Sequence, residues 1–207
     1  MKDLLFKMLA DILAGTDFRL KKSDDAFIRK ITDGRQTIGL SLYDYNPEFV
    51  FSLVICIRLE SVETIFHLFS GSPSPEYQAM SETTITQLEY FMAAPAEFSV
   101  TTEQDVAANG RVLSGVVRGK IVPFLDKLQD VKSLDIAVNR QVPGINSTQP
   151  PYGPMTSIIL AHLAGNPDYD RLVARHRADL NLPPEMDYPF NHLVEYLDKL
   201  RSAGPVP

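Results

Sequence analysis

The sequence has a single cysteine and no tryptophan among its 207 residues. That cysteine, Cys56, cannot form a disulfide within the chain, and alone it cannot supply a Cys-x-x-Cys metal or redox site. It lies in the apolar run of residues 49–59, where a small buried thiol is the natural interpretation. Such cysteine usage is typical of a reducing cytosol, so we expect a cytoplasmic location.

Long uncharged apolar runs are also missing. The longest, residues 49–57, is about half as long as a membrane-spanning helix requires, and it is rich in β-branched residues. In the N-terminal segment, residues 1–15, the charges of Asp3, Lys7 and Asp11 interrupt the apolar residues. This segment therefore predicts an amphipathic helix and not a signal peptide, and we expect no membrane association.

Positive charge is in short supply. The chain has 20 Lys and Arg residues against 26 Asp and Glu residues, which gives a net charge of −6 and a pI of about 5.2. A general nucleic-acid binder needs a cationic surface, because it must displace counterions from the phosphates. We therefore expect no nucleic-acid partner.

The shortage of positive charge is greatest in the middle of the chain. Between Arg35 and Arg111 the only basic residue is Arg58. The same interval holds ten acids: Asp44, Glu48, Glu60, Glu63, Glu76, Glu82, Glu89, Glu97, Glu103 and Asp105. One hypothesis is a negative face that receives a basic protein, built from several of Glu48, Glu60, Glu63, Glu76, Glu82 and Glu89. The alternative is that these charges only solvate scattered loops.

Motifs that carry specific chemistry are absent. The sequence has no Gly-x-Ser-x-Gly elbow and no His-Glu-x-x-His. Residues 114–121 approach a phosphate-binding loop, but Ser114 stands where its first glycine belongs and Ile121 where its magnesium-binding Ser or Thr belongs. We interpret Gly115 and Gly119 instead as places where another backbone approaches a helix. No catalytic residue, metal ligand or cofactor is assigned.

Alternating apolar residues predict an antiparallel sheet. Residues 36–43 and 49–59 alternate well and are joined by a turn at residues 44–47. Short strands at 18–22 and 26–32 would precede them, and 62–69 would continue the meander. Short turns make neighbouring strands antiparallel. The expected fold class is α+β, with a sheet of four to five strands, an N-terminal helix and a C-terminal group of helices.

The helical segments suggest how the chain is organised. A long helical pattern follows Thr102, and Pro123 predicts a kink or break near residues 119–122. For residues 82–92 the pattern slightly favours helix over strand. The proline-rich segment 142–154 is a possible linker before a helical extension, 155–203. We expect a single domain, 1–207, because the apolar stripes of these helices need a surface to cover.

Two histidines, His162 and His176, fall on apolar stripes of two C-terminal helices. If these helices pack antiparallel, the rings could approach each other near Asp168 or Asp170 and form an acid–base or metal site. The alternative is two partly buried histidines with backbone partners. A typical zinc site needs three or four ligands, which favours the alternative.

Three further groups of side chains are candidates for binding. Arg58 and His67 would lie on neighbouring strands, near Glu60 or Glu63, as an anion pocket or as a salt-bridged sheet edge. An aromatic cluster around the turn would pack in the core or act as a binding hot spot: Tyr43, Tyr45 and Phe49. A basic patch on the first strands would be solvated or bind an acidic partner: Lys21, Lys22, Arg29, Lys30 and Arg35.

The order of segments over residues 1–138 resembles a bacterial family of domains of unknown function. The resemblance rests on Phe18-Arg19-Leu20-Lys21-Lys22, Phe27-Ile28-Arg29, Gln36-Thr37-Ile38-Gly39-Leu40 and Val122-Pro123-Phe124-Leu125. In that family a "gF-x-K-K…F-x-R" opening precedes a sheet, and a Pro-Trp/Phe-Leu element lies in a late helix. Residues 70–97 and the C-terminal helices depart from the pattern. The resemblance implies no activity, and it implies an immunity-like or accessory role by analogy only.

These observations lead to two functional expectations. The first is a cytosolic bacterial protein-binding or accessory module, immunity-like, with a basic protein as partner. The second is a small enzyme that uses His162 or His176 with nearby carboxylates. A deep pocket with convergent polar groups would favour the enzyme, whereas an exposed acidic or apolar patch would favour the binding module.

Overall fold

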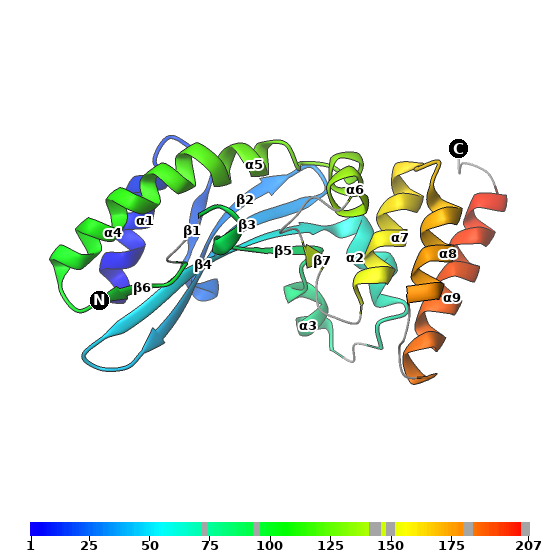
Figure 1. The fold of residues 1–207 in the computed structure, drawn as a ribbon, viewed down its shortest axis with the longest axis horizontal. Coiled ribbons are helices and arrows are strands. Elements are labelled where there is room, and N and C mark those ends of the chain that lie inside the picture. Colours follow the sequence, from blue (N-terminus) through cyan, green and yellow to red (C-terminus); the bar gives the residue numbers. More distant parts are fainter. Residues whose placement is uncertain (72–73, 93–95, 141–145, 148–151, 180–183, 204–207) are drawn as a thin grey trace. The chain divides into compact units, whose positions relative to one another are not determined.

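The structure is a computed structural model that describes the chain except for residues 72–73, 93–95, 141–145, 148–151, 180–183 and 204–207, and except for the side chains of 146–147 and 184–188 (Figure 1). Its contacts divide the chain into two compact units. Unit 1 comprises Met1–Ile57 and Ile85–Gln129, and unit 2 comprises Arg58–Thr84 and Asp130–Pro207. The predicted linker falls largely outside the described residues, and a single domain stays a prediction.

An antiparallel sheet forms the centre of unit 1. Its strands are β1 (Arg19–Lys21), β2 (Ala26–Ile31), β3 (Gly34–Asp44), β4 (Phe49–Leu59), β5 (Thr84–Gln87) and β6 (Phe98–Val100). They run in the order β1-β2-β3-β4-β5, and β6 also pairs with β4. In the antiparallel registers Phe27 lies opposite Ile38, and Phe51 lies opposite Phe98. The α+β class and the antiparallel sheet are confirmed.

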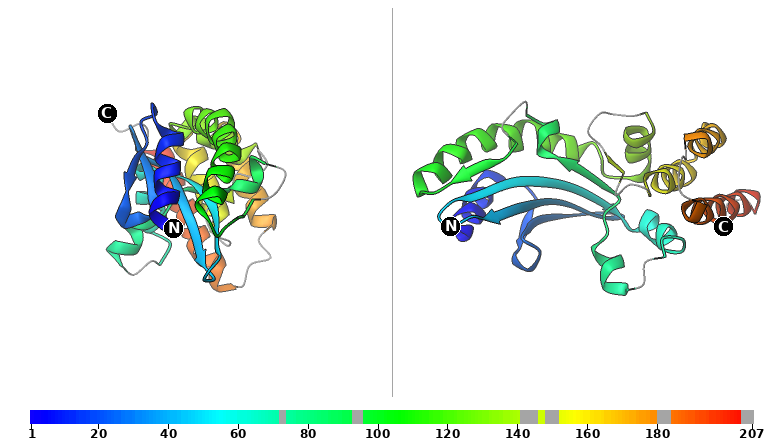
Figure 2. Two further views of the ribbon diagram at one scale, coloured as in Figure 1. Left: turned by 90° about the vertical axis from the view of Figure 1, so that its left-hand side faces the viewer. Right: turned by 60° about the horizontal axis from the view of Figure 1, so that its bottom comes forward.

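Helices cover one face of this sheet. They are α1 (Lys2–Leu13), α4 (Glu103–Val116), the π-helical turn η3 (Val117–Ile121) and α5 (Val122–Asp126), with short 3₁₀ turns η1 (Lys22–Asp24) and η2 (Leu88–Tyr90). Helices α4 and α5 run along the sheet, as Figures 1 and 2 show. The break predicted from Pro123 is confirmed. This proline has no N–H to give to the carbonyl of Gly119, and the wider π turn directly precedes α5.

Two sequence-based expectations about secondary structure were wrong in detail. Residues 62–69 do not continue the meander, because Glu60–His67 forms helix α2, which buries Val62 and Phe66 four residues apart. Residues 82–92 are not a helix: β5 is followed directly by η2.

The glycines of α4 and η3 also differ from expectation. A Cβ atom at Gly115 or Gly119 would meet nothing within 4 Å, so no backbone approaches there. The close approach is at Gly110, where a Cβ would come within 2.9 Å of the Met8 side chain of α1. Gly110 therefore lets α1 and α4 pack closely together.

Unit 2 is mainly helical. Besides α2 it contains α3 (Pro75–Met80), α6 (Val131–Asn139), the short strand β7 (Asn146–Ser147), α7 (Gly153–Ala164), α8 (Tyr169–Asp179) and α9 (Pro184–Ser202). Helices α7, α8 and α9 lie side by side in Figure 1. Helix α7 contacts α2, α6, α8 and α9, and it buries every residue from Met155 to Ala161. It is therefore the central helix of this unit and not an amphipathic one with a single buried stripe.

One buried amide ties the end of α5 to the sheet of unit 1. Gln36 is fully buried, and its Nε2 donates to the carbonyls of Leu125 at 2.7 Å and Leu128 at 2.9 Å. Its Oε1 accepts from Nε and Nη2 of Arg29 at 2.9 and 2.6 Å. All four hydrogen-bonding positions of the amide are occupied. Arg29 also pairs with Asp126 at 2.6 Å, so it is not free to join the predicted basic patch.

This arrangement predicts that Gln36→Leu destabilises the protein. The leucine would remove the side-chain donor of the Leu128 carbonyl and one of the two donors of the Leu125 carbonyl, which keeps the Leu128 amide. It would also leave Arg29 without its Gln36 acceptor, and we expect a total cost of about 2–4 kcal/mol in unfolding free energy. Urea unfolding of Gln36→Leu and of the control Gln87→Leu, at an exposed position of β5, measures the effect. Equal stability of the two variants would show that the buried amide is dispensable.

Candidate functional site

The first polar cluster of unit 2 is built around Arg58, at the end of β4. The arginine is only 6% exposed, and its guanidinium donates to both carboxylate oxygens of Glu60 at 2.7 and 2.8 Å. Glu63 of α2 is 2% exposed and lies 3.8 Å from Arg58. The Glu63 Oε1 atom also accepts from Thr83 at 2.8 Å. The positive charge of Arg58 is thus compensated inside the protein, and the predicted anion pocket does not form here.

A serine and a histidine lie within the same cluster. Ser81 Oγ accepts a hydrogen bond from Arg58 Nη1 at 2.8 Å. Its own hydrogen is directed to Glu63 Oε2 at 2.5 Å and to the carbonyl of Gln78 at 2.9 Å. Both of these oxygens can only accept. His67 Nε2 lies 2.7 Å from the same hydroxyl and must therefore donate to it. A catalytic base would have to accept the serine proton instead. This serine is saturated with hydrogen bonds and not activated.

This cluster corrects the sequence-based view in two respects. Arg58 and His67 do meet, but on a strand end and a helix and not on neighbouring strands. Burial lowers the pKa of the His67 imidazole, although Glu63 opposes the effect. Glu60 and Glu63 are partners of Arg58, so they are not free members of a negative face.

The second polar cluster joins α6, α7 and α8. The buried carboxylate of Asp135 accepts from Asn139 Nδ2 at 2.6 Å and from Asn166 Nδ2 at 2.8 Å. Asn139 Nδ2 also donates to the carbonyl of Ser157 at 3.0 Å. The hydroxyl of Ser157 donates to Asn139 Oδ1, and it lies 2.8 Å from His176 Nε2.

The direction of these hydrogen bonds follows from chemistry alone. Both partners of Asn139 Nδ2 are acceptors, so its Oδ1 must face Ser157 and receive the serine proton. The hydroxyl can then only accept from His176 at 2.8 Å, so the His176 Nε2 atom carries a hydrogen. Arg175 Nη2, which is also a donor, lies 3.5 Å from the same nitrogen, too far to compete with this bond. Burial, together with the charge of Arg175, lowers the pKa of His176 to about 4. The imidazole is therefore neutral near pH 7 and is not oriented to remove the serine proton.

The histidines and acids proposed for an enzyme have different partners. The ring of His162 packs against Tyr169 with 6.1 Å between centroids, and burial lowers its pKa. Asp168 pairs with Arg171 at 3.0 Å, and Asp170 pairs with Arg201 at 2.7 Å. Within the described residues, no group of three or more metal-ligating side chains comes together. This arrangement favours structural roles for His162 and His176.

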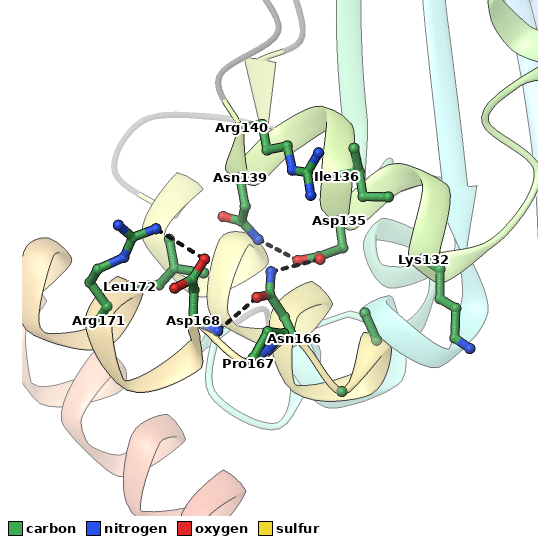
Figure 3. A pocket seen from close by; sticks show the side chains of 12 residues that line it. Lys132, Asp135, Ile136, Asn139, Arg140, Asn166, Pro167, Asp168, Arg171 and Leu172 are labelled. Carbon is green, nitrogen blue, oxygen red and sulfur yellow. Dashed lines mark hydrogen bonds and ion pairs between the residues drawn. The ribbon is translucent and has the colours of Figure 1, made fainter.

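A cavity of about 290 Å³ lies in front of Asp135. One wall is a stripe of α6, and the other is the turn between α7 and α8, residues 164–168, with the start of α8 (Figure 3). The α6 stripe consists of Lys132, Asp135, Ile136 and Asn139, and it is continued by Arg140 at the C-cap of the helix. In Figure 3 the side chains of Asn139 and Asn166 converge on Asp135 from the two walls. The sequence pattern does not predict this site, because its two walls come from segments about thirty residues apart.

The tip of the β3–β4 hairpin in unit 1 is a different kind of surface. Tyr43 and Tyr45 are 51% and 64% exposed, and their rings stack with 6.4 Å between centroids. The Tyr45 amide donates to the carbonyl of Glu48 at 2.8 Å, and the Asn46 amide donates to Asp44 at 3.0 Å. The two tyrosines are therefore not core residues, and their role as a binding hot spot stays a prediction.

Comparison with models of known families, with curated proteins and with solved structures returned no match. The resemblance of residues 1–138 to a bacterial family accordingly stays a prediction. Among the described residues, no helix is both long enough and apolar enough to cross a membrane.

The Arg58 cluster predicts unequal effects for its two glutamates. Glu63→Gln should lower the unfolding free energy by about 3 kcal/mol, because it leaves Arg58 with less compensation in a buried site. Glu60→Gln, on a side chain that is 53% exposed, should cost less than about 1 kcal/mol. Chemical unfolding of the two variants distinguishes them. A smaller loss for Glu63→Gln than for Glu60→Gln would contradict the assigned network.

The second cluster predicts a pH dependence of stability. His176 has a folded-state pKa of about 4, below its ordinary value of 6.5, so the unfolded chain binds the proton more tightly. Its contribution is fully present above about pH 6.5 and is lost as the pH falls toward 4, by at most about 1.4 kcal/mol per pH unit. His176→Gln keeps an N–H donor for Ser157 but does not titrate.

Thermal unfolding between pH 7 and pH 4 checks this expectation. The His176→Gln variant should lose less stability than the wild type over that range, whereas His192→Gln, at an exposed position of α9, should follow the wild type. Parallel curves for all three proteins would contradict a buried neutral His176.

Proposed function

We propose that this protein is a protein-binding module that contacts a basic surface of its partner with the tip of the β3–β4 hairpin. The observation that carries the proposal is the stacked pair of exposed tyrosines, Tyr43 and Tyr45. Tyrosine is enriched at binding hot spots, because it offers a large, rigid contact area and a polar hydroxyl at a low cost in conformational entropy. Burying this pair against a partner would remove apolar ring surface from water.

The backbone of the hairpin supports the same role. The register of β2 on β3 ends with Ala26 opposite Gly39, so β3 continues toward its tip beyond the last residue paired with β2. Turn hydrogen bonds at Tyr45 and Asn46 hold the tip in one shape. A shaped tip loses little conformational freedom on binding, which favours affinity.

Charge defines the partner. Residues 36–57, which form most of the two strands and their turn, include no Lys or Arg, while Asp44 and Glu48 flank the tyrosines. The register that places Phe49 opposite Val100 brings the start of α4, with Glu103 and Asp105, toward the same end of β4. Such a field speeds the encounter with a basic protein and weakens with salt. This narrower set replaces the acidic cluster expected from the sequence.

The proposed function also includes a cellular location and a biological role. We assign the module to the bacterial cytoplasm as an accessory or immunity-like protein, which rests on the resemblance of residues 1–138 and on the single cysteine. An immunity-like protein neutralises its partner by binding, so it needs a recognition surface and no reaction centre. The exposed, acidic, aromatic hairpin tip supplies such a surface.

The test begins by identifying the partner through the tip itself. A photo-crosslinking amino acid at position 45 should capture one basic protein in cells that encode the chain, and the same group at Tyr77, a 48% exposed tyrosine of α3, should not. With the purified partner, the double variant Tyr43→Ser/Tyr45→Ser should bind about 30-fold or more weakly. Tyr77→Ser should bind like the wild type.

Charge is tested with the same partner. Asp44→Asn/Glu48→Gln should slow association and flatten its dependence on salt, without changing the melting temperature. Crosslinks that are equally frequent at positions 45 and 77, or unchanged affinity of the double tyrosine variant, would refute the assigned surface.

A further inference from the structure

The cavity in front of Asp135 lies in unit 2, and its chemistry differs from that of the hairpin tip. Residues 132, 135, 136 and 139 of its α6 wall share one face of the helix, and Arg140 follows directly at the C-cap. Lys132 and Arg140 stand at the two ends of this wall, about 12 Å apart along the helix axis. Both are exposed, and neither forms an ion pair with another described residue.

The floor of the cavity has the opposite charge. Asp135 is buried, and each of its carboxylate oxygens accepts one amide hydrogen, from Asn139 and from Asn166. Each oxygen keeps a further lone pair that could accept from a ligand. The opposite wall adds an ion pair of its own, between Arg171 and Asp168 at 3.0 Å. The cavity thus presents a carboxylate between two exposed cations, neither of which lies within ion-pair distance of a described carboxylate.

This order of charges selects among ligand classes. A simple anion would be attracted by Lys132 and Arg140 but repelled by Asp135. A simple cation would be attracted by Asp135 but repelled by Lys132 and Arg140. A zwitterion satisfies both, with its ammonium group at Asp135 and its carboxylate at Arg140 or Lys132. The remaining wall is apolar, formed by Ile136, Pro167 and Leu172, and would receive an aliphatic side chain.

The size and rigidity of the cavity agree with this class. About 290 Å³ is at the lower end of ligand cavities, which suits a single amino acid. The two asparagines are held by Asp135, and Asn166 Oδ1 also accepts from the amide of Asp168 at 2.9 Å. A floor fixed in this way needs little reordering when a ligand binds. We propose that this cavity binds a free aliphatic α-amino acid, independently of the hairpin tip.

The test is a titration of the full-length protein with four probes: L-leucine, isocaproate, L-leucinamide and inorganic phosphate. Isocaproate lacks the ammonium group, and leucinamide lacks the carboxylate. Leucine should shift the NMR signals of the Asn139 and Asn166 side-chain amides, with saturation at or below about 10 mM. Each of the other three probes should bind at least about 10-fold more weakly.

Variants place the ligand in the cavity. Lys132→Gln/Arg140→Gln changes only exposed side chains and should weaken leucine binding at least about 10-fold. Arg177→Gln, at an exposed position of α8 that does not line the cavity, should bind like the wild type. Equal binding of leucine and isocaproate or phosphate would overturn the zwitterion. Absence of any shift with leucine, or undiminished binding by the double variant, would overturn the site.

Discussion

The buried carboxylate of Asp135 is the constraint on which the organisation of unit 2 depends. A charge-bearing group away from water must find hydrogen-bond donors, and here two asparagine amides supply them from α6 and from the turn before α8. Because the Nδ2 group of Asn139 donates to Asp135, its Oδ1 atom accepts from the Ser157 hydroxyl. The hydroxyl therefore accepts from His176 Nε2, which is the donor in that contact. The same carboxylate orients Asn166 and so fixes the opposite wall of the cavity.

The rule that explains this cluster also explains the other buried polar groups. Gln36 uses all four of its hydrogen-bonding positions, and Ser81 is surrounded by Arg58, His67 and Glu63. In a sequence, a combination of serine, histidine and an acid can suggest catalysis. In this structure these side chains form hydrogen bonds that link secondary-structure elements. The surfaces proposed to bind are those whose side chains remain exposed and available to a ligand or partner. They are the tyrosines of the hairpin tip and the cations at the cavity rim.

Local patterns in the sequence predicted local structure well. The alternation in β3 and β4, the tight turn between them and the break before Pro123 each depend on residues close in the chain. The segment 62–69 was misread because a short apolar run fits both a strand and a helix, and burial of Glu63 against Arg58 decides for the helix.

The candidate sites depend on contacts between distant segments, which periodicity does not reveal. The spacing predicted apolar stripes for His162 and His176, and both side chains are half-buried, but it could not show that Tyr169 and Ser157 are their neighbours. The charged stripe of α6 can be read from residues 132–140, whereas its counterpart Asn166 lies 31 residues from Asp135. The sequence predicted a cluster of the hairpin-tip tyrosines, and only their exposure in the structure supports the proposed role in binding.

The central claim is that Asp135 organises the polar interior of unit 2 for architecture and binding and not for proton transfer. The tautomer of His176 tests it most directly, because the direction of every hydrogen bond from Asp135 to this ring follows from one assignment. Nitrogen-15 NMR of the imidazole near pH 7 should show a neutral ring with its hydrogen on Nε2. A charged ring, or a neutral ring with its hydrogen on Nδ1 and a bare Nε2 facing Ser157, would contradict the account.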